Sequence, residues 1–503
     1  MNGMDFEGMV KTACAAPIWT VEAEGTSWRK IAQACADQGG RLVSIWGSEA
    51  EEGFAVFAAC VFSEGMLISR CVAADGKFES LADIFPCAAR MQRAVHDMLG
   101  IRCEEVDERP WLSHGLWPPF PLRKNYDPGP GVAPVWENYP FVAVEGEGVH
   151  EIAVGPVHAG IIEPGHFRFQ VVGEKVLRLE ERLGYKHKGI EKAFEGLAPE
   201  RGAELAARIS GDSTVAYSWA YAMALEALCG VTVSTRASFL RGIFLERERI
   251  ANHLADLGAL GNDAGFSFGH AQFSVIREDM LRISKAHFGH RLLMDVIVPG
   301  GVSREIDAAA REAILAECAA VREKVLVLRE IYADHTGLQD RFLSTGKVEA
   351  TLAAKLGLTG LAGRASRNAS DLREDHPCVP YDRLDVSMAT HHGGDVAARV
   401  SVRFDEILES LRLICAMLER MPEGEIAREI PECSGFGAGW VEGFRGEVLL
   451  ALEVEKGVIR RAHAHDPSWQ NWPVLEFAVI GNIVADFPLI NKSFNLSYSG
   501  HDL

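Results

Sequence analysis

The sequence predicts an α+β protein, with a small N-terminal α/β domain followed by a larger, mainly helical domain that carries small β-sheets. Three observations support this class. The first 126 residues alternate strand-like apolar runs with helical segments. From about residue 200 to residue 421, apolar residues recur at helical spacing with charged residues between them. Strand-like runs return on both sides of this helical region.

The N-terminal domain is expected to occupy residues 1–126. Runs rich in apolar and β-branched residues predict its strands, and Pro86 and Gly100 bracket its second helix, as start and stop signals do. The expected elements are a helix over 21–39, strands over 41–46, 54–62 and 66–72, and a helix over 88–99.

A linker is expected over residues 127–140, because its glycine and proline content opposes regular structure. The second domain would then span 141–503. Its expected strands are 165–172, 175–181, 447–455 and 458–463, and its expected helices are 202–229, 236–260, 273–290, 303–334 and 396–421, before a last apolar stretch over 474–490.

Composition limits the function classes. The formal charge of −19 and the lack of a basic stretch argue against nucleic-acid binding. The first residues carry acids where a signal peptide carries Lys or Arg, and no apolar run reaches the roughly 18 residues of a membrane span. We therefore expect a cytoplasmic protein that is soluble or peripheral. The eleven cysteines are scattered without a CxxC motif and are expected to be reduced.

Three runs of the N-terminal part resemble the 30-kDa subunit of respiratory complex I. They are Phe85-Pro86, residues 96–101 (HDMLGI) and residues 121–126 (PLRKNY). The family usually has a glutamate where Ala94 stands. The resemblance implies a 30-kDa-like domain over residues 1–126.

Residues 155–196 resemble the opening of the large subunit of membrane-bound [NiFe] hydrogenases and of its relative, the 49-kDa subunit of complex I. The resemblance extends over most of residues 150–503, which implies a [NiFe]-hydrogenase-like large-subunit domain over 141–503. Further matching runs are 208–228, 241–257, 299–302, 357–360, 371–373, 394–399, 421–424 and 442–447.

The family holds its nickel and iron with two CxxC pairs, because soft thiolates bind these metals where hydroxyls do not. In this chain the first pair falls on Ser210 and Ser213, and the second on Ser497 and Gly500. All four thiolates are replaced. We therefore expect no nickel–iron centre and no hydrogenase activity. The chain also ends at Leu503, about where a matured hydrogenase subunit would end.

Complex I places a quinone headgroup in the corresponding pocket, next to a histidine and a tyrosine. The resemblance carries the histidine over to His158 in GPVHAG, while the tyrosine position falls on Gly211. Tyr217 and Tyr498 are the nearest substitutes in sequence. The alternative for His158 is a turn histidine bonded to the backbone.

Two further residues match functional positions of the family. Glu191 matches a glutamate that passes protons in hydrogenases, although a carboxylate at a helix start is also favoured by the helix dipole. Arg445 matches an arginine near the active pocket. A buried arginine needs a carboxylate partner, and Glu442 and Asp395 are the candidates.

Two functions follow from the resemblance. The first is an electron-transferring subunit of a membrane-associated NADH–quinone oxidoreductase or hydrogenase-like complex, coupled to ion movement, with His158 as proton donor. The second is a non-catalytic coupling subunit of such a complex. A free-standing enzyme is the third alternative.

In the first two cases the expected partners are an iron–sulfur small subunit, a ferredoxin-like subunit and antiporter-like membrane subunits, with the chain on the cytoplasmic face of the cell membrane. Apart from a quinone, no cofactor is expected on this chain. The iron–sulfur cluster and any NADH would be held by other subunits. A tunnel from Ser210 and Ser497 would favour the first function, and a pocket filled by side chains would favour the second.

Overall fold

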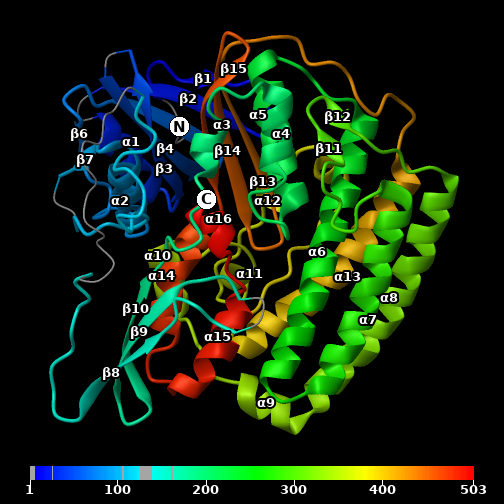
Figure 1. Ribbon diagram of the computed structural model, residues 1–503. Coiled ribbons are helices and arrows are strands. Elements are labelled where there is room, and N and C mark those ends of the chain that lie inside the picture. Colours follow the sequence, from blue (N-terminus) through cyan, green and yellow to red (C-terminus); the bar gives the residue numbers. More distant parts are fainter. Residues whose placement is uncertain (1–5, 25–26, 52, 105–106, 125–138, 160–161) are drawn as a thin grey trace.

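The computed structural model confirms the α+β class (Figure 1). The linker expected over 127–140 lies almost wholly outside the described residues, so the domain division stays a prediction. The structure describes residues 6–24, 27–51, 53–104, 107–124, 139–159 and 162–503.

The N-terminal part forms a five-stranded sheet in the order β1-β2-β5-β4-β3. Strand β4 is apolar throughout because both faces of the sheet are covered: Val56 and Ala58 face the cluster that includes α1 and α2, while Phe57 and Ala59 face the main core. The elements are β1 (Val10–Lys11), β2 (Ile18–Ala23), α1 (Ser27–Asp37), β3 (Arg41–Ala50), β4 (Gly53–Phe62), β5 (Gly65–Val72), β6 (Lys77–Phe78), α2 (Ala88–Leu99) and β7 (Arg102–Cys103).

The prediction of a helix over 21–39 is wrong for its first residues. Residues Ile18–Ala23 form β2, which pairs in parallel with β5, and the helix begins only at Ser27. Sheet pairing therefore decides the structure of a segment that the local pattern had assigned to a helix.

Two three-stranded antiparallel sheets follow (Figure 1). The sheet β13-β14-β15 lies between the N-terminal sheet and the helices, and the sheet β8-β9-β10 lies beside α14. The sequence indicated β9, β10, β14 and β15, but not β8 or β13. The strands are β8 (Val149–Val154), β9 (His166–Val172), β10 (Lys175–Arg182), β13 (Gly435–Glu442), β14 (Glu447–Glu455) and β15 (Val458–His465).

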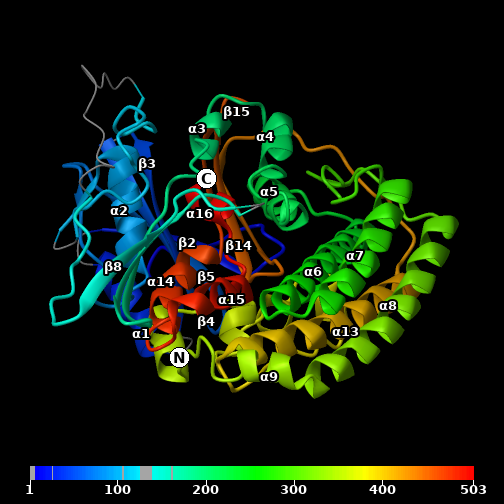
Figure 2. The same cartoon turned by 60° about the horizontal axis from the view of Figure 1, so that its bottom comes forward.

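The long helices α6, α7, α8 and α13 lie side by side in a bundle (Figures 1 and 2). Side-chain caps set their starts: the Ser234 hydroxyl accepts the Ala237 amide of α6 at 3.1 Å, and Asp307 accepts the Ala310 amide of α8 at 2.8 Å. The helices are α6 (Thr235–Asp263), α7 (Ser267–Phe288), α8 (Ala308–Asp334) and α13 (Val396–Arg420).

The helix expected over 202–229 is two helices, because residues 207–213 form a turn between α4 and α5. Among the described helices, none is both long and apolar enough to cross a bilayer. The remaining elements are α3 (Ile190–Phe194), α4 (Pro199–Ala206), α5 (Thr214–Cys229), β11 (Ile297–Val298), β12 (Gly301–Val302), α9 (Thr336–Phe342), α10 (Ala350–Leu356), α11 (Gly360–Arg364), α12 (Leu372–Asp375), η2 (Tyr381–Arg383), α14 (Ser468–Ala478), η3 (Val484–Asp486), α15 (Phe487–Phe494) and α16 (Tyr498–Asp502).

The N-terminal sheet packs directly on the sheet β13-β14-β15. The Trp46 ring stacks on Phe57 (5.1 Å between centroids) and on His463 of β15 (4.8 Å), and Phe57 stacks on Phe436 of β13 (5.7 Å). These four rings form a continuous stack across the two sheets, of the kind that contributes both buried area and aromatic contact.

Removal of the Trp46 ring tests whether the two sheets share one core. We expect Trp46→Ala to lower the free energy of unfolding by about 3–5 kcal/mol, because it opens a cavity where Trp46 is 2% exposed. Denaturant titration of the full chain measures this loss. Leu116→Ala, at a side chain that is 73% exposed, is the control and should change stability by less than about 0.5 kcal/mol. Equal losses in the two variants would contradict a shared core.

Candidate functional site

The turn before α5 and the C-terminal segment bring two of the four degenerate ligand positions, Ser210 and Ser497, into side-chain contact. Ser210 lies in the turn, and its hydroxyl is 3.2 Å from the hydroxyl of Ser497. Ser210 also donates to the Asp212 carboxylate at 2.6 Å. Ser497 caps α16, since its hydroxyl accepts the Gly500 amide at 2.8 Å. Residues 287 positions apart therefore meet through side-chain hydroxyls.

The fourth position, Gly500, is closed to a side chain. A Cβ atom on Gly500 would overlap the Asp466 carboxylate and would lie 2.8 Å from the Tyr217 hydroxyl. The Tyr217 hydroxyl donates to that same carboxylate at 2.9 Å, and both residues are at most 1% exposed. A phenol and a carboxylate thus occupy the space next to the position of the family's fourth thiolate.

These residues do not fit a nickel–iron centre. The three serine hydroxyls are hard, protonated groups, whereas nickel and iron in this type of site are held by thiolates. Two of the hydroxyls hydrogen-bond to each other, and the fourth position has no side chain. Among the described residues, no group of three or more His, Cys, Asp or Glu side chains is placed to hold a metal ion.

Arg445 joins the turn to the C-terminal segment. Its guanidinium pairs with Asp212, donates to the Ser213 hydroxyl at 3.2 Å and donates to the Asn495 carbonyl. Burial would raise the pKa of Asp212, but the Arg445 charge and hydrogen bond outweigh it and lower that pKa to about 2. At neutral pH this edge of the site is therefore an ion pair.

The partners expected for Arg445 were wrong. Asp395 caps α13, where it accepts the Ala398 amide at 2.9 Å, and it also accepts the Ser344 amide at 2.8 Å. Glu442 pairs instead with Arg364 at 2.9 Å. No sequence signal pointed to Asp212, which is far from Arg445 along the chain.

Tyr217, Tyr498 and the family's tyrosine position, Gly211, have different surroundings. Tyr217 points into the site, and burial together with the neighbouring Asp466 raises its pKa well above the usual value. Gly211 lies exposed in the turn. Tyr498 is buried against Trp472, with 4.9 Å between ring centroids, and faces the backbone of Gly165. Asp466, which no motif of the sequence had indicated, is the group that orients Tyr217.

His158 lies in the loop between β8 and β9, where its Nε2 atom is 2.8 Å from the Gly165 carbonyl oxygen. Its ring also approaches Phe167, with 5.9 Å between centroids. This is the contact expected of a turn histidine bonded to the backbone. Gly165 in turn faces the Tyr498 ring, so this backbone segment connects His158 to the site. Its role as a proton donor stays a prediction.

Glu191 lies in a three-residue ion cluster between the two parts of the chain. Its carboxylate is 3.0 Å from Arg461 and 2.7 Å from His463, whose Nε2 atom is 2.8 Å from the Ser44 hydroxyl of the N-terminal sheet. Burial would raise the pKa of Glu191, but Arg461 and His463 lower it to about 2. A carboxylate held this firmly as an anion anchors the two sheets, and proton transfer through it stays a prediction. A cavity of about 40 Å³ adjoins the three side chains.

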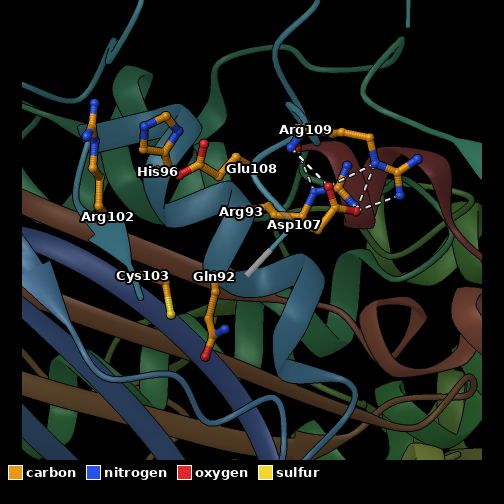
Figure 3. Close-up of a pocket in the computed structure, with 8 residues that line it drawn as sticks. All are labelled: Gln92, Arg93, His96, Arg102, Cys103, Asp107, Glu108 and Arg109. Atoms are coloured by element: carbon orange, nitrogen blue, oxygen red, sulfur yellow. Dashed lines mark hydrogen bonds and ion pairs between the residues drawn. The ribbon is translucent and has the colours of Figure 1, made fainter. Parts of the chain in front are cut away.

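A larger cavity, of about 170 Å³, lies in the N-terminal part beside α2 (Figure 3). Asp107 is its central anion and pairs with Arg109 at 2.6 Å and Arg93 at 3.3 Å. None of the residues expected from the sequence to form a site lines this cavity. Two arginines already neutralise the carboxylate, which leaves it little capacity to bind a cationic ligand.

The expectation of reduced cysteines was wrong for one pair. Cys229 and Cys433 are joined as a disulfide, with Cα atoms 5.5 Å apart, within the range that such a bond spans. The other nine cysteines are free.

Comparison with known proteins gives two family matches. Residues 263–438 match the family described as respiratory-chain NADH dehydrogenase, 49 Kd subunit, and residues 21–131 match the 30 Kd subunit of the same enzyme. Formate hydrogenlyase subunit 5 of Escherichia coli is 31% identical over 85% of this chain and 77% of its own length. Hydrogenase-4 component G of the same organism is 32% identical, over 87% of this chain and 78% of its own length.

A component of the NADH-quinone oxidoreductase of Phocaeicola vulgatus is 30% identical, over 74% of this chain and 76% of its own length. Among solved structures, a chain of the membrane-bound sulfane sulfur reductase, an archaeal respiratory membrane complex, superposes with a TM-score of 0.67. The match covers 71% of this chain and 99% of that chain at 24% identity, which supports the fold alone.

The crowding at Gly500 gives a test with a matched control. We expect Gly500→Ala to lower the free energy of unfolding by about 1–3 kcal/mol, because the added methyl group must displace the buried Asp466 carboxylate. Gly211→Ala, in the exposed turn of the same site, has no atom within 4 Å of the added carbon and should be neutral. The denaturant midpoints of the two variants measure the difference in stability. A Gly500→Ala variant as stable as wild type would mean that the pocket is open.

Proposed function

The chain belongs to the family that unites the 49 Kd and 30 Kd subunits of respiratory-chain NADH dehydrogenase with the large subunits of membrane-bound hydrogenases, and on that premise we propose that it is a coupling subunit without a nickel–iron centre. It would be part of a membrane-associated oxidoreductase complex. In that complex it would transmit electrostatic and conformational change between an electron-transferring partner and an ion-translocating membrane arm.

One observation carries the proposal. The four positions that hold metal in the hydrogenases of the family are here joined or filled by protein groups: Ser210 bonds to Ser497, and Asp466 with Tyr217 occupies the space beside Gly500. Such a closed network supports a transmitting role over a catalytic one, because a substrate would first have to break these hydrogen bonds.

The partners follow from the family and are part of the proposal. An iron–sulfur small subunit and a ferredoxin-like subunit would deliver electrons, and antiporter-like membrane subunits would form the membrane arm. The chain would lie on the cytoplasmic face of the membrane. Relatives named as a membrane-bound hydrogenase subunit alpha and as hydrogenase-4 component G support this kind of assembly.

Quinone reduction by this chain is the second candidate, and it is favoured by the place of His158. The loop that carries His158 touches the C-terminal segment through Gly165 and Tyr498 and through Glu163, which accepts the Ser499 amide at 3.0 Å. A quinone entering beside this loop could reach a histidine without opening the serine network.

Metal content tests the central claim. In the complex purified through a tag on this chain, we expect iron from partner subunits and no nickel, since no thiolate lies at the four positions. Elemental analysis by inductively coupled plasma mass spectrometry measures both metals on one sample. One nickel per chain would contradict the proposal.

Turnover distinguishes the two candidates. For a coupling subunit, we expect Ser210→Ala and His158→Ala to leave quinone-dependent electron transfer within about twofold of wild type, since neither side chain would act on substrate. Ion translocation per electron, measured on vesicles containing the complex, should fall in Ser210→Ala. A loss of electron transfer of about a hundredfold in His158→Ala would support the quinone site instead.

A further inference from the structure

Three arginines lie in the interior between the helix bundle and the sheet β13-β14-β15, away from the serine network. Arg249 of α6 and Arg364 of α11 are fully buried, and Arg373 of α12 is 2% exposed. An arginine stays charged at any pH that the fold meets. Since charges in a water-free interior are costly unless paired, this cluster must contain a matching number of anions.

Four carboxyl groups contact these arginines, and three of them accept several short hydrogen bonds. Glu246 accepts from Tyr381 and Ser410, both at 2.6 Å, as well as from Arg249 and Arg373.

Asp371 accepts two hydrogen bonds from Arg373, at 2.7 and 3.0 Å. Glu406 accepts two from Arg364, at 2.6 and 3.0 Å, and contacts His253. These three carboxyls are therefore strongly favoured as anions.

The fourth carboxyl, Glu442, has far fewer donors. One oxygen accepts from Arg364 at 2.9 Å, a guanidinium that it shares with Glu406 and Asp371. The other oxygen accepts only the Leu372 amide, at 3.3 Å. Glu442 is 4% exposed and therefore has little contact with bulk solvent. Of the four carboxyls, it is the one least stabilised as an anion.

The charge count within the cluster favours one bound proton. With all four carboxyls ionised, the cluster has one more negative charge than its three arginines supply. Arg403 and Lys492 both pair with Asp256, at 3.1 and 3.7 Å, and lie outside this count. One bound proton brings the cluster to neutrality.

His253 is the alternative carrier of this proton, and the geometry disfavours it. Its Nε2 atom lies 2.7 Å from Glu406, but its Nδ1 atom has no hydrogen-bond partner among the described residues. An imidazolium here would bury an N–H group without an acceptor. Burial lowers the pKa of His253, whereas burial and the nearby Asp371 raise the pKa of Glu442 to about 7.

We infer that Glu442 is a proton-binding site of the protein interior, which takes up and releases one proton. Glu442 ends β13 and lies three residues before Arg445, on the turn to β14. Arg249 also holds this turn, donating to the carbonyls of Glu442 at 2.7 Å and Gly443 at 2.9 Å. Ionisation of Glu442 therefore changes the charge balance of a segment that leads directly to the Arg445–Asp212 pair.

The proton binding is a property of the fold alone, and only its use in coupling rests on the proposed function. If the chain is a coupling subunit, Glu442 links the charge of the serine site to α6, α11 and α13. A failure of the proposed function, such as nickel in the complex, would leave the proton site standing. If Glu442 proves not to bind a proton, the expected absence of nickel from the complex is equally unaffected.

Infrared difference spectroscopy of the full chain, titrated between pH 5 and 9, tests the inference. We expect wild type to lose protonated-carboxyl absorption as pH rises through neutrality. We expect Glu442→Gln to lack the part of this absorption that Glu442 contributes, because an amide cannot ionise, and to keep the part from Glu248, whose pKa burial raises to about 8. Glu174→Gln, at an exposed loop residue, is the matched control and should keep the band. A titrating band of unchanged intensity in Glu442→Gln would overturn the assignment.

Stability gives a second readout. The pKa of Glu442 is higher in the folded state than in the unfolded state, so its contribution is present at low pH and is lost as pH rises toward about 7. Relative to Glu442→Gln, the wild-type folding constant should fall by up to tenfold per pH unit in this window. If the variant does not fold, Glu248→Gln removes the other raised carboxyl, and absence of any remaining carboxyl band that titrates would overturn the inference.

Discussion

The interior of this protein depends on arginine–carboxylate pairing. Arg364 is fully buried and reaches Glu406 of α13, Glu442 of β13 and Asp371 before α12. A guanidinium has five donors in a fixed plane, so it can satisfy several acceptors only if the elements that carry them are held in one arrangement. Breaking such a pair would leave an uncompensated charge in the core. The pairing thus fixes how the helix bundle packs against the sheet β13-β14-β15.

At the serine site, hydrogen bonds and an ion pair likewise hold two segments of the chain in one arrangement. A metal centre would hold the turn before α5 and the C-terminal segment together through four bonds. Here the two segments are held by the Ser210–Ser497 contact and by Arg445, which bonds to Asp212 on one side and Asn495 on the other. Hydrogen bonds to charged groups are stronger than neutral ones, so one arginine can replace part of what the metal would supply.

Much of the fold could be predicted from the sequence, because periodicity and caps are local. Helix α13 was expected over 396–421 and is observed over Val396–Arg420, since Asp395 marks its start. The turn within 202–229 was missed although residues 210–213 (SGDS) carry a turn signal, and the partners that set its conformation lie far along the chain. Asp212 meets Arg445 across 233 positions and Tyr217 meets Asp466 across 249, and no local signal reports such pairs.

The N-terminal part contacts the residues that hold Glu191. Ser44 and Trp46 of β3 contact His463, which holds Glu191 at the start of α3. The backbone carbonyl of Gly47 in turn accepts from Arg461, the second partner of Glu191. Without these contacts, an arginine and a carboxylate of the larger part would be exposed at an apolar face. The N-terminal sheet therefore completes the electrostatics of the larger part.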